Sequence, residues 1–172
     1  MSKQVRLQQM YNVMEEMLNS GGTVNFNPRG YSMCPTLRND GDRVVIKKIS
    51  SLKKYDLPLY IRPDGSFVLH RVVSVNKDGT YNICGDNQWD IEHNVKHSQV
   101  VGVVTTIERK GKRFSVNNPL YKIYVVFWVA IRPLRHIVFG GIRKLKKAMG
   151  GTVHLILLAI GGLMAYLYNS PD

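Results

Sequence analysis

Cysteine and acidic residues are both scarce in this chain of 172 residues, and each shortage excludes a class of protein. Only Cys34 and Cys84 occur, so a fold stapled by several disulfides is excluded, and we expect two free thiols. Lys and Arg number 24 against 12 for Asp and Glu, which gives a formal net charge of +12. Such an excess favours an anionic partner, either nucleic acid or an acidic lipid surface.

Two further features are missing from the sequence. It contains no recognisable nucleic-acid-binding module, and its first residues lack the apolar stretch of a cleavable secretory signal. Basic residues border apolar segments near the C-terminus, at Arg132, Arg135, Arg143, Lys144, Lys146 and Lys147. This arrangement favours a membrane surface over nucleic acid as the anionic partner.

Residues 1–22 have the spacing of an amphipathic helix. Apolar side chains recur at the i, i+3, i+4, i+7 interval, at Leu7, Met10, Tyr11, Met14, Met17 and Leu18. Gly21-Gly22 then supplies a stop signal. We predict a helix that packs on the domain after it, and the alternative is a helix that lies in a membrane surface.

Residues 23–116 predict a β-rich domain. Short runs rich in β-forming residues alternate with turn residues, at Arg43–Ile49, Leu57–Ile61, Phe67–Val75, Thr80–Cys84 and Val100–Glu108. Lys110-Gly111-Lys112 is a hairpin signal after the last run. This pattern predicts a mainly β fold with antiparallel pairing. Both faces of Phe67–Val75 are largely apolar, so we predict a central strand that holds His70 rigidly.

The most informative stretch of the chain is Gly30-Tyr31-Ser32-Met33-Cys34-Pro35-Thr36-Leu37, which Gly41-Asp42 follows. Gly30 allows the backbone to bend before the serine, and Pro35 fixes the backbone dihedral after it. The pattern predicts a tight turn that presents the hydroxyl of Ser32.

Two later fragments supply the groups that a nucleophilic serine requires. Leu69-His70-Arg71 offers a base for its proton, and Gly85-Asp86-Asn87 offers an acid to orient that base. Each residue also has an ordinary structural explanation: a turn serine, a core histidine, and an aspartate that caps its own turn. The three fragments together favour catalytic roles for Ser32, His70 and Asp86.

At these residues the chain resembles the type I signal peptidases, in a serine protease group that also includes the self-cleaving SOS repressors. That group's motif, Ser-Met-x-Pro-Thr-(Leu/Ile) with Gly-Asp a few residues on, stands here as Ser32–Leu37 and Gly41-Asp42. Typical bacterial members have a lysine base. The His70-Arg71 pair is instead similar to the archaeal and endoplasmic-reticulum branch, whose acidic box resembles Gly85-Asp86-Asn87.

The resemblance covers roughly residues 24–107 and implies both a fold and an activity. It implies coiled antiparallel β-sheets and a serine endopeptidase that cleaves signal or leader peptides of exported precursors, with small residues before the cut. Ser32 would be the nucleophile, His70 the base and Asp86 the orienting acid, while Met33 and Pro35 would contact substrate. No cofactor and no metal are expected.

The chain departs from the family at two positions. Gly30 replaces a serine whose hydroxyl helps to bind the oxyanion, so backbone N–H groups, including that of Ser32, must do so. The family's second acidic residue falls near Asp90 or Glu92, and the spacing does not choose between them. The segment Thr23–Phe26 is a candidate sheet edge on which an extended peptide can pair.

Other functions are compatible with parts of the pattern. A self-cleaving regulator would carry a DNA-binding domain in front of the core, and about 22 residues are too few for one. A catalytically inactive, membrane-associated binding module is the other alternative. His93 and His97 have the spacing of zinc ligands on a helix, but polar residues separate them, and we predict an exposed turn without metal.

Residues 117–172 predict a basic and apolar region that associates with a membrane. Leu120–Ile131 and Val153–Tyr168 are both apolar, but each is shorter than the roughly 20 residues of a typical span. We predict two insertions or a shallow anchor in the membrane plane, with the basic residues cytoplasmic and the catalytic face outside. The alternatives are a single spanning helix, which would place a peptidase in the cytoplasm, and a helix packed on the β domain.

Overall fold

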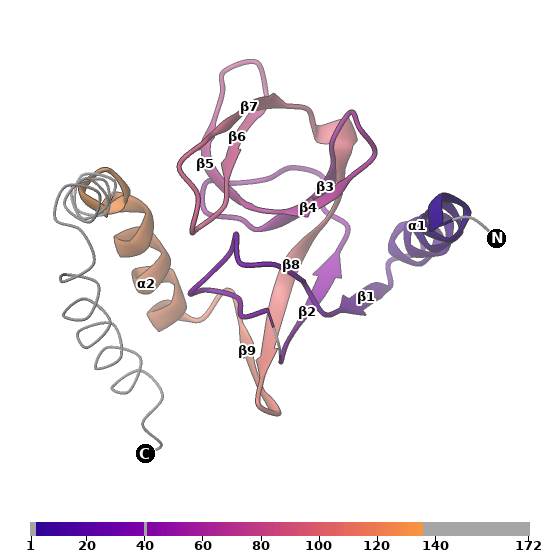
Figure 1. Cartoon of the computed structure of the whole chain (residues 1–172), viewed down its shortest axis with the longest axis horizontal. Helices are drawn as coiled ribbons and strands as arrows, with labels where there is room; N and C mark the ends of the chain where they lie inside the picture. The colour runs from indigo at the N-terminus through magenta and orange to yellow at the C-terminus, as the bar shows by residue number, and fades with distance from the viewer. Residues whose placement is uncertain (1–2, 40, 136–172) are drawn as a thin grey trace, which may run out of the picture. The chain divides into compact units, whose positions relative to one another are not determined.

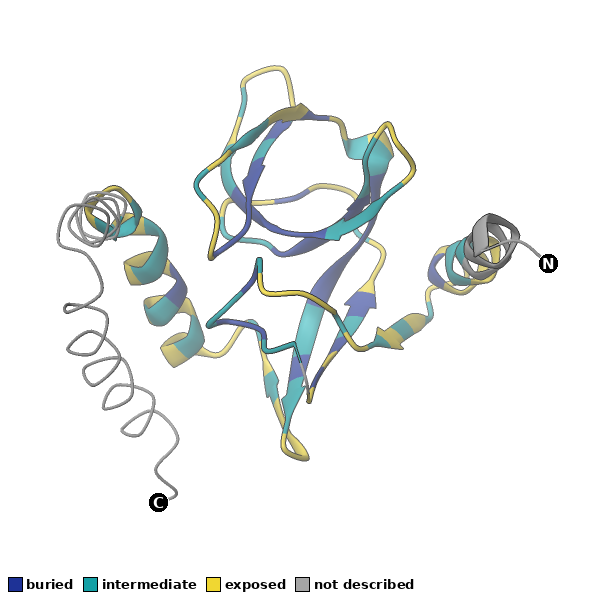
Figure 2. Ribbon diagram, viewed as in Figure 1, coloured by how far each residue is buried: buried dark blue, intermediate teal, exposed yellow. Residues whose placement is uncertain are grey.

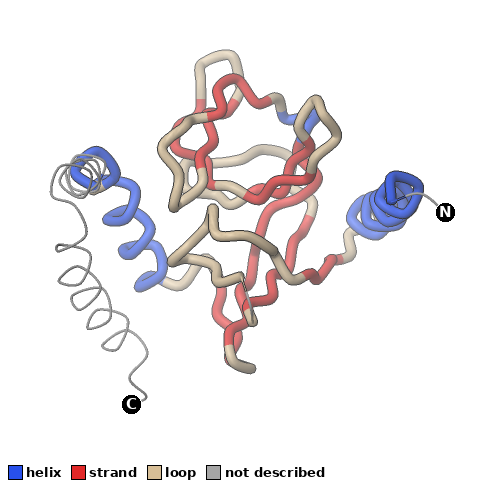
Figure 3. The backbone as a smooth tube through the Cα atoms, in the orientation of Figure 1, coloured by secondary structure: helices blue, strands red, loops and turns tan. Residues whose placement is uncertain are grey.

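The computed structural model describes residues 3–39 and 41–135, with the side chains of the first helix described from Tyr11 onward. This part of the chain is mainly β, and its strand pairings are antiparallel (Figures 1 and 3). The helices and strands are α1 (Lys3–Asn19), β1 (Thr23–Phe26), β2 (Asp42–Lys47), β3 (Pro58–Ile61), β4 (Phe67–Leu69), β5 (Arg71–Val75), β6 (Tyr81–Cys84), β7 (Glu92–Val95), β8 (Val100–Arg109), β9 (Lys112–Ser115) and α2 (Pro119–Ala130). The mainly β prediction is therefore confirmed, and so is the hairpin at residues 110–112.

The larger sheet is organised around the long strand β8. Its order is β1-β2-β8-β3-β4, and β9 pairs with β8 as the second arm of the hairpin. Val44 and Ile46 of β2 are both fully buried and pair with Ile107 and Val104 of β8. These two partners are three residues apart because a bulge inserts an extra residue, Thr105, between them.

The smaller sheet has the order β5-β6-β7, and a second apolar cluster fills the space between it and the larger sheet. Val72 and Ile83, which are fully buried, come from the smaller sheet. Val100 and Val103 of β8 belong to this same cluster, whereas Val104 of β8 belongs to the cluster formed with β2. One strand therefore forms part of both hydrophobic cores.

The predicted single strand over residues 67–75 is wrong, because the chain changes sheets at His70. Leu69 pairs with Leu59 in the larger sheet, whereas Arg71 pairs with Cys84 in the smaller sheet. Both halves contain buried apolar residues, so the apolar pattern continues across the break. Hydrophobic periodicity reports burial and does not report which strand is the partner. The turn predicted at His93 is also wrong, since that residue lies in β7.

Helix α1 packs on the β domain, as the preferred prediction has it. Leu18 is 1% exposed within the first core cluster, and Tyr11 and Met14 pack against that cluster. The packed face is narrower than predicted, because Met17 is 45% exposed. The helix ends at Asn19, and Gly21 just after it has a φ of 82°, which is readily adopted only by glycine.

Helix α2 corresponds to the first apolar run of the C-terminal region. Asn118 caps it through a hydrogen bond of 2.9 Å from the backbone N–H of Leu120 to Oδ1, and Pro119 occupies the first turn. No helix among residues 3–39 and 41–135 combines the length and the apolar character needed to cross a bilayer. The second apolar run, 153–168, lies outside the described residues, so the predicted C-terminal apolar helices remain a prediction for that part.

Candidate active site

Ser32 lies on a tight turn that side chains from several segments hold in place. The backbone N–H of Gly30 donates to Asn39 Oδ1 at 2.6 Å, and the backbone N–H of Arg38 donates to Asp42 Oδ2 at 2.8 Å. Arg109 from β8 donates to both Asp42 and the carbonyl oxygen of Thr36. The Gly-Asp pair that follows the serine motif therefore fixes the end of the turn.

The backbone conformation at position 30 explains why this residue is a glycine. Its φ is +98°, a region in which residues with a Cβ are strained. A serine at this position, as in the relatives that the sequence resembles, would require a different backbone. Within the described residues, the backbone N–H of Ser32 has no hydrogen-bond acceptor, so it is available to an oxyanion.

The loop after β6 lies directly against the serine turn. The backbone N–H of Asn87 donates to the carbonyl oxygen of Ser32 at 2.8 Å, and the Asn87 side chain donates to Tyr31. A Cβ on Gly85 would lie only 2.7 Å from the Ser32 carbonyl oxygen. The glycine of the Gly85-Asp86-Asn87 box is therefore required by the close approach of two backbones.

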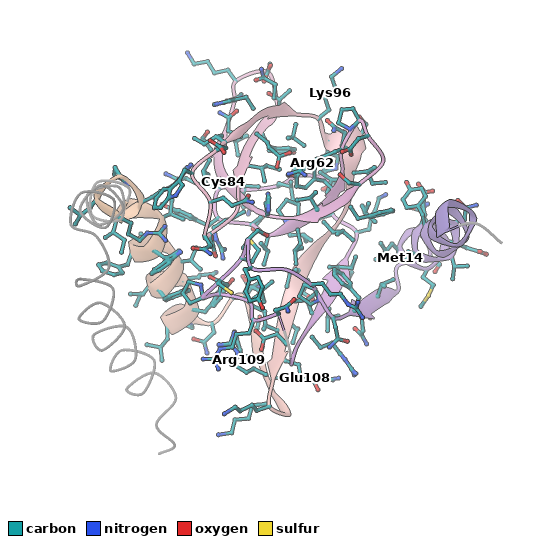
Figure 4. All side chains as sticks on the ribbon, in the orientation of Figure 1. Met14, Arg62, Cys84, Lys96, Glu108 and Arg109 are labelled. Carbon is teal, nitrogen blue, oxygen red and sulfur yellow. The ribbon has the colours of Figure 1, made fainter. Side chains whose placement is uncertain are left out.

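His70 is 3% exposed, and its imidazole faces a carboxylate. Glu92 Oε1 lies 3.3 Å from His70 Nδ1, and the Tyr60 hydroxyl lies 3.5 Å from the same nitrogen. Arg62 holds Glu92 with two hydrogen bonds, one from Nε to Oε2 at 2.8 Å and one from Nη2 to Oε1. Figure 4 labels Arg62 where the chain leaves β3.

The charges around the imidazole act on its pKa in opposite directions. Burial has the largest effect and lowers the pKa of His70, because it disfavours the imidazolium form. The Glu92 carboxylate opposes burial, but the net pKa of His70 stays below its ordinary value. Hydrogen bonds from Arg62 lower the pKa of Glu92, so that side chain is ionised when His70 titrates.

Asp86 has a different set of partners from the one the sequence suggested. Its carboxylate accepts two hydrogen bonds from Arg71, Nε to Oδ1 and Nη2 to Oδ2, each at 2.7 Å. Thr36 donates a further short hydrogen bond to Oδ2. Arg71 is 1% exposed and Asp86 is 5% exposed, so the two form a buried ion pair. The carboxylate that faces the imidazole belongs to Glu92 instead.

Ser32 and His70 open on the same cavity, which has a volume of about 900 Å³. Its walls are largely apolar and include Phe26, Met33, Leu37, Leu59, Phe67 and Leu69. Of the two residues predicted to contact substrate, Met33 lies in the wall, whereas Pro35 is not among the lining residues. Within the described residues no hydrogen bond joins the Ser32 hydroxyl to the imidazole. Such contacts commonly tighten only in the complex with substrate.

Sequence reasoning identified Ser32 and His70 but missed two neighbours of the imidazole, Tyr60 and Arg62. No motif marks either residue, because both face His70 only through the pairing of β3 with β4. Glu92 was one of two open alternatives, and the other, Asp90, is exposed. Glu92 begins β7, where it pairs with Ile83 of β6, and its Oε1 lies 3.3 Å from His70 Nδ1.

Comparison of the chain with models of known protein families, with characterised proteins and with solved structures finds no match.

Proposed function

We propose that this protein is a serine endopeptidase of the signal-peptidase type, with a Ser-His-Glu catalytic set. One observation carries the proposal: a serine on a tight turn and a buried histidine open on one apolar cavity, and a carboxylate lies 3.3 Å from the histidine ring. A nucleophile, a base and an orienting acid are the groups that acyl transfer requires. The motif around Ser32 supports the same class.

The mechanism follows from the atoms in the site. Ser32 Oγ attacks the scissile carbonyl while His70 Nε2 removes the hydroxyl proton, and Nδ1–H donates to Glu92. The tetrahedral oxyanion accepts a hydrogen bond from the backbone N–H of Ser32. The imidazolium then gives its proton to the leaving amine. Departure of the amine leaves the acyl group on Ser32 as an acyl-enzyme. A water molecule, deprotonated by His70, hydrolyses that ester and restores the serine.

Asp86 acts in this proposal as a structural residue. Its pairing with Arg71 fixes the loop whose Asn87 N–H holds the Ser32 carbonyl oxygen. Because Arg71 follows His70 directly, the same pair also fixes the backbone next to the base. Asp86 therefore influences catalysis through position, and Glu92 influences it through contact with the imidazole.

Substrate would bind as an extended peptide between two sheet edges. Both β1 and β4 lie at the ends of the strand order in the larger sheet, and residues of both line the cavity, including Phe26 and Phe67. Backbone pairing with an edge strand provides affinity, and alternate side chains fill pockets. The apolar lining around Met33 suits small apolar residues before the cut, as in the leader peptides of exported precursors.

We place the protein at the cell membrane, with the catalytic face outside the cytoplasm. The basic and apolar composition of residues 117–172 motivates this part of the proposal. The native thiols are poor reporters of sidedness, because Cys84 is buried and burial raises the pKa of the half-buried Cys34. A cysteine introduced at Lys77, in the exposed turn between β5 and β6, should react with an impermeant thiol reagent in intact cells. Reaction only after lysis would place the domain in the cytoplasm.

Cleavage of a peptide with small residues before the scissile bond tests the catalytic proposal. We expect Ser32→Ala and His70→Ala each to reduce kcat/KM by at least about 10³-fold, with little change in the free energy of unfolding. Ser98→Ala and His93→Ala alter exposed residues outside the cavity and should retain wild-type activity. Activity of the His70→Ala protein above about a tenth of wild type would contradict the assignment of the base.

The same assay separates the two competing functions. An inactive binding module would bind the peptide without cleaving it, and the Ser32→Ala protein would bind equally well. A self-cleaving regulator would shorten its own chain, which intact-mass measurement of the purified protein detects. The peptidase proposal predicts cleavage of the added peptide and a stable mass for the enzyme.

A further inference from the structure

Helix α2 is apolar on two faces, and among the described residues one of these faces packs on the domain while the other is exposed. The packed face consists of Tyr121, Tyr124, Val125 and Trp128, at the i, i+3, i+4, i+7 spacing of one helix side. Val125 is 2% exposed, and the Trp128 indole donates to the backbone carbonyl of Asp86 at 3.1 Å. The Tyr124 hydroxyl lies 3.0 Å from Thr36 Oγ1. The helix orientation is therefore fixed by polar contacts as well as by burial.

The opposite face of α2 consists of large apolar side chains in solvent. Leu120 is 76% exposed, Ile123 66%, Phe127 60% and Val126 45%. Leu120, Ile123 and Phe127 follow the i, i+3, i+7 spacing, so they form one continuous stripe. Figure 2 shows exposed residues along α2. Four large apolar side chains gathered on one helix are unusual on a protein surface, where exposed apolar residues are commonly scattered singly.

Basic side chains outnumber acidic ones around this stripe. Lys122 lies on α2, and it lines a second cavity together with Lys53, Lys54 and one acidic residue, Asp56. Along the sequence, residues 109–171 contain 11 Lys and Arg residues and no Asp or Glu. An apolar helix face with basic residues and no acidic residues matches the composition of helices that lie in the surface of an anionic bilayer.

We propose that the outer face of α2, formed by Leu120, Ile123, Val126 and Phe127, docks in the plane of an anionic lipid surface. The helix has 12 residues, which is too short to span a bilayer but sufficient to bury one apolar stripe at the interface. A second copy of this chain is disfavoured as the occupant because it carries the same positive charge. Docking of α2 on lipid does not require peptidase activity.

The docking face can be probed by a fluorophore placed on α2 of the full chain. Ile123→Cys is labelled with an environment-sensitive dye, and the protein is mixed with vesicles that contain a nitroxide-labelled lipid. The matched control is Val75→Cys, at an apolar position of β5 with 45% exposure. The unsubstituted protein gives the background, since its own cysteines are half-buried and buried. This readout is specific for α2 even if another segment also holds the chain on the vesicle.

We expect quenching at position 123 to exceed that at position 75 by at least about threefold on vesicles that contain phosphatidylglycerol. On vesicles of phosphatidylcholine alone, or in high salt, quenching at position 123 should fall. Equal quenching at the two positions, or none at position 123, would overturn the proposal. A blue-shifted emission at position 123 without lipid would also overturn it. That result would assign the face to a second copy if the protein sediments as a dimer, and to another segment of this chain if it sediments as a monomer.

Discussion

Glu92 Oε1 lies 3.3 Å from His70 Nδ1, and Arg62 holds the carboxylate in that position with two hydrogen bonds. The imidazole therefore has a carboxylate acceptor beside Nδ1. This arrangement selects the tautomer in which Nε2 is free to take a proton, and it stabilises the imidazolium that follows.

The first prediction concerns this acceptor. Glu92→Gln keeps the shape of the side chain but removes its charge, and the amide can donate a hydrogen bond that favours the wrong tautomer. We expect kcat/KM to fall by about 10²–10⁴-fold, with the loss mainly in kcat, as measured by peptide cleavage. The exposed residue Asp90 provides the matched control, and Asp90→Asn should leave both constants within about twofold of wild type. Equal losses in the two variants would remove Glu92 from the catalytic set.

The second prediction concerns the buried pair of Arg71 and Asp86. Asp86→Asn leaves the guanidinium without a compensating charge, so the free energy of unfolding should fall by about 3–5 kcal/mol. Urea denaturation measures this loss directly. Replacing both residues, as in Arg71→Met with Asp86→Leu, should recover part of the stability because no uncompensated charge remains. A stable Asp86→Asn protein without activity would return Asp86 to the catalytic set.

The third prediction concerns pH. The base must be neutral, so kcat/KM should be lost as pH falls through the pKa of His70 in the free enzyme. Since burial lowers that pKa, the acidic limb should lie below about pH 6.5, the reference value for histidine. In the Glu92→Gln protein the limb should move further down, because the carboxylate that raises the pKa is gone.

If kcat/KM rose with pH only above about pH 8.5, that result would contradict a histidine base and would indicate a lysine base. Lys47 and Lys48 are the first lysines after the serine motif in the sequence, and both are exposed.

The fourth prediction concerns the approach of Gly85 to the serine turn. In Gly85→Ala the new Cβ would lie 2.7 Å from the Ser32 carbonyl oxygen and 2.8 Å from Gln88 Oε1. The glutamine can move aside, but the carbonyl belongs to the turn that positions the nucleophile. We expect kcat/KM to fall by about 10²-fold through displacement of Ser32.

A double variant separates these two contacts. Gly85→Ala with Gln88→Ala removes the flexible neighbour and leaves the backbone contact in place, so it should not restore activity. Recovery of activity in the double variant would assign the effect to Gln88.

Much of the fold follows from local signals in the sequence. Alternating β-forming runs, the Lys110-Gly111-Lys112 turn and the Gly21-Gly22 stop are readable because turn chemistry acts over a few residues. The break at His70 is not readable in this way. The segments on either side of His70 both contain buried apolar residues, so their pattern does not mark the break. The change of sheet depends on pairing with strands elsewhere in the sequence.

In the site, too, only features that depend on neighbouring residues can be predicted from the sequence. The serine turn is marked by residues that act on their immediate neighbours, so its motif is visible in the sequence. The partner of His70 is not marked locally. Gly-Asp-Asn drew attention to Asp86, but the neighbouring Arg71 pairs with that carboxylate. The conformation between β6 and β7 then decides that Glu92 faces the ring.

The participation of β8 in both cores has a consequence for how the protein unfolds. Met33 and Leu37 anchor the nucleophile turn in one core, whereas Tyr60 and Val95 anchor the surroundings of the base and its acid in the other. Because the two cores share β8, neither can melt without removing part of the packing of the other. Loss of structure in either core therefore separates Ser32 from His70. Under the proposed mechanism, a partly unfolded chain would be inert as a peptidase.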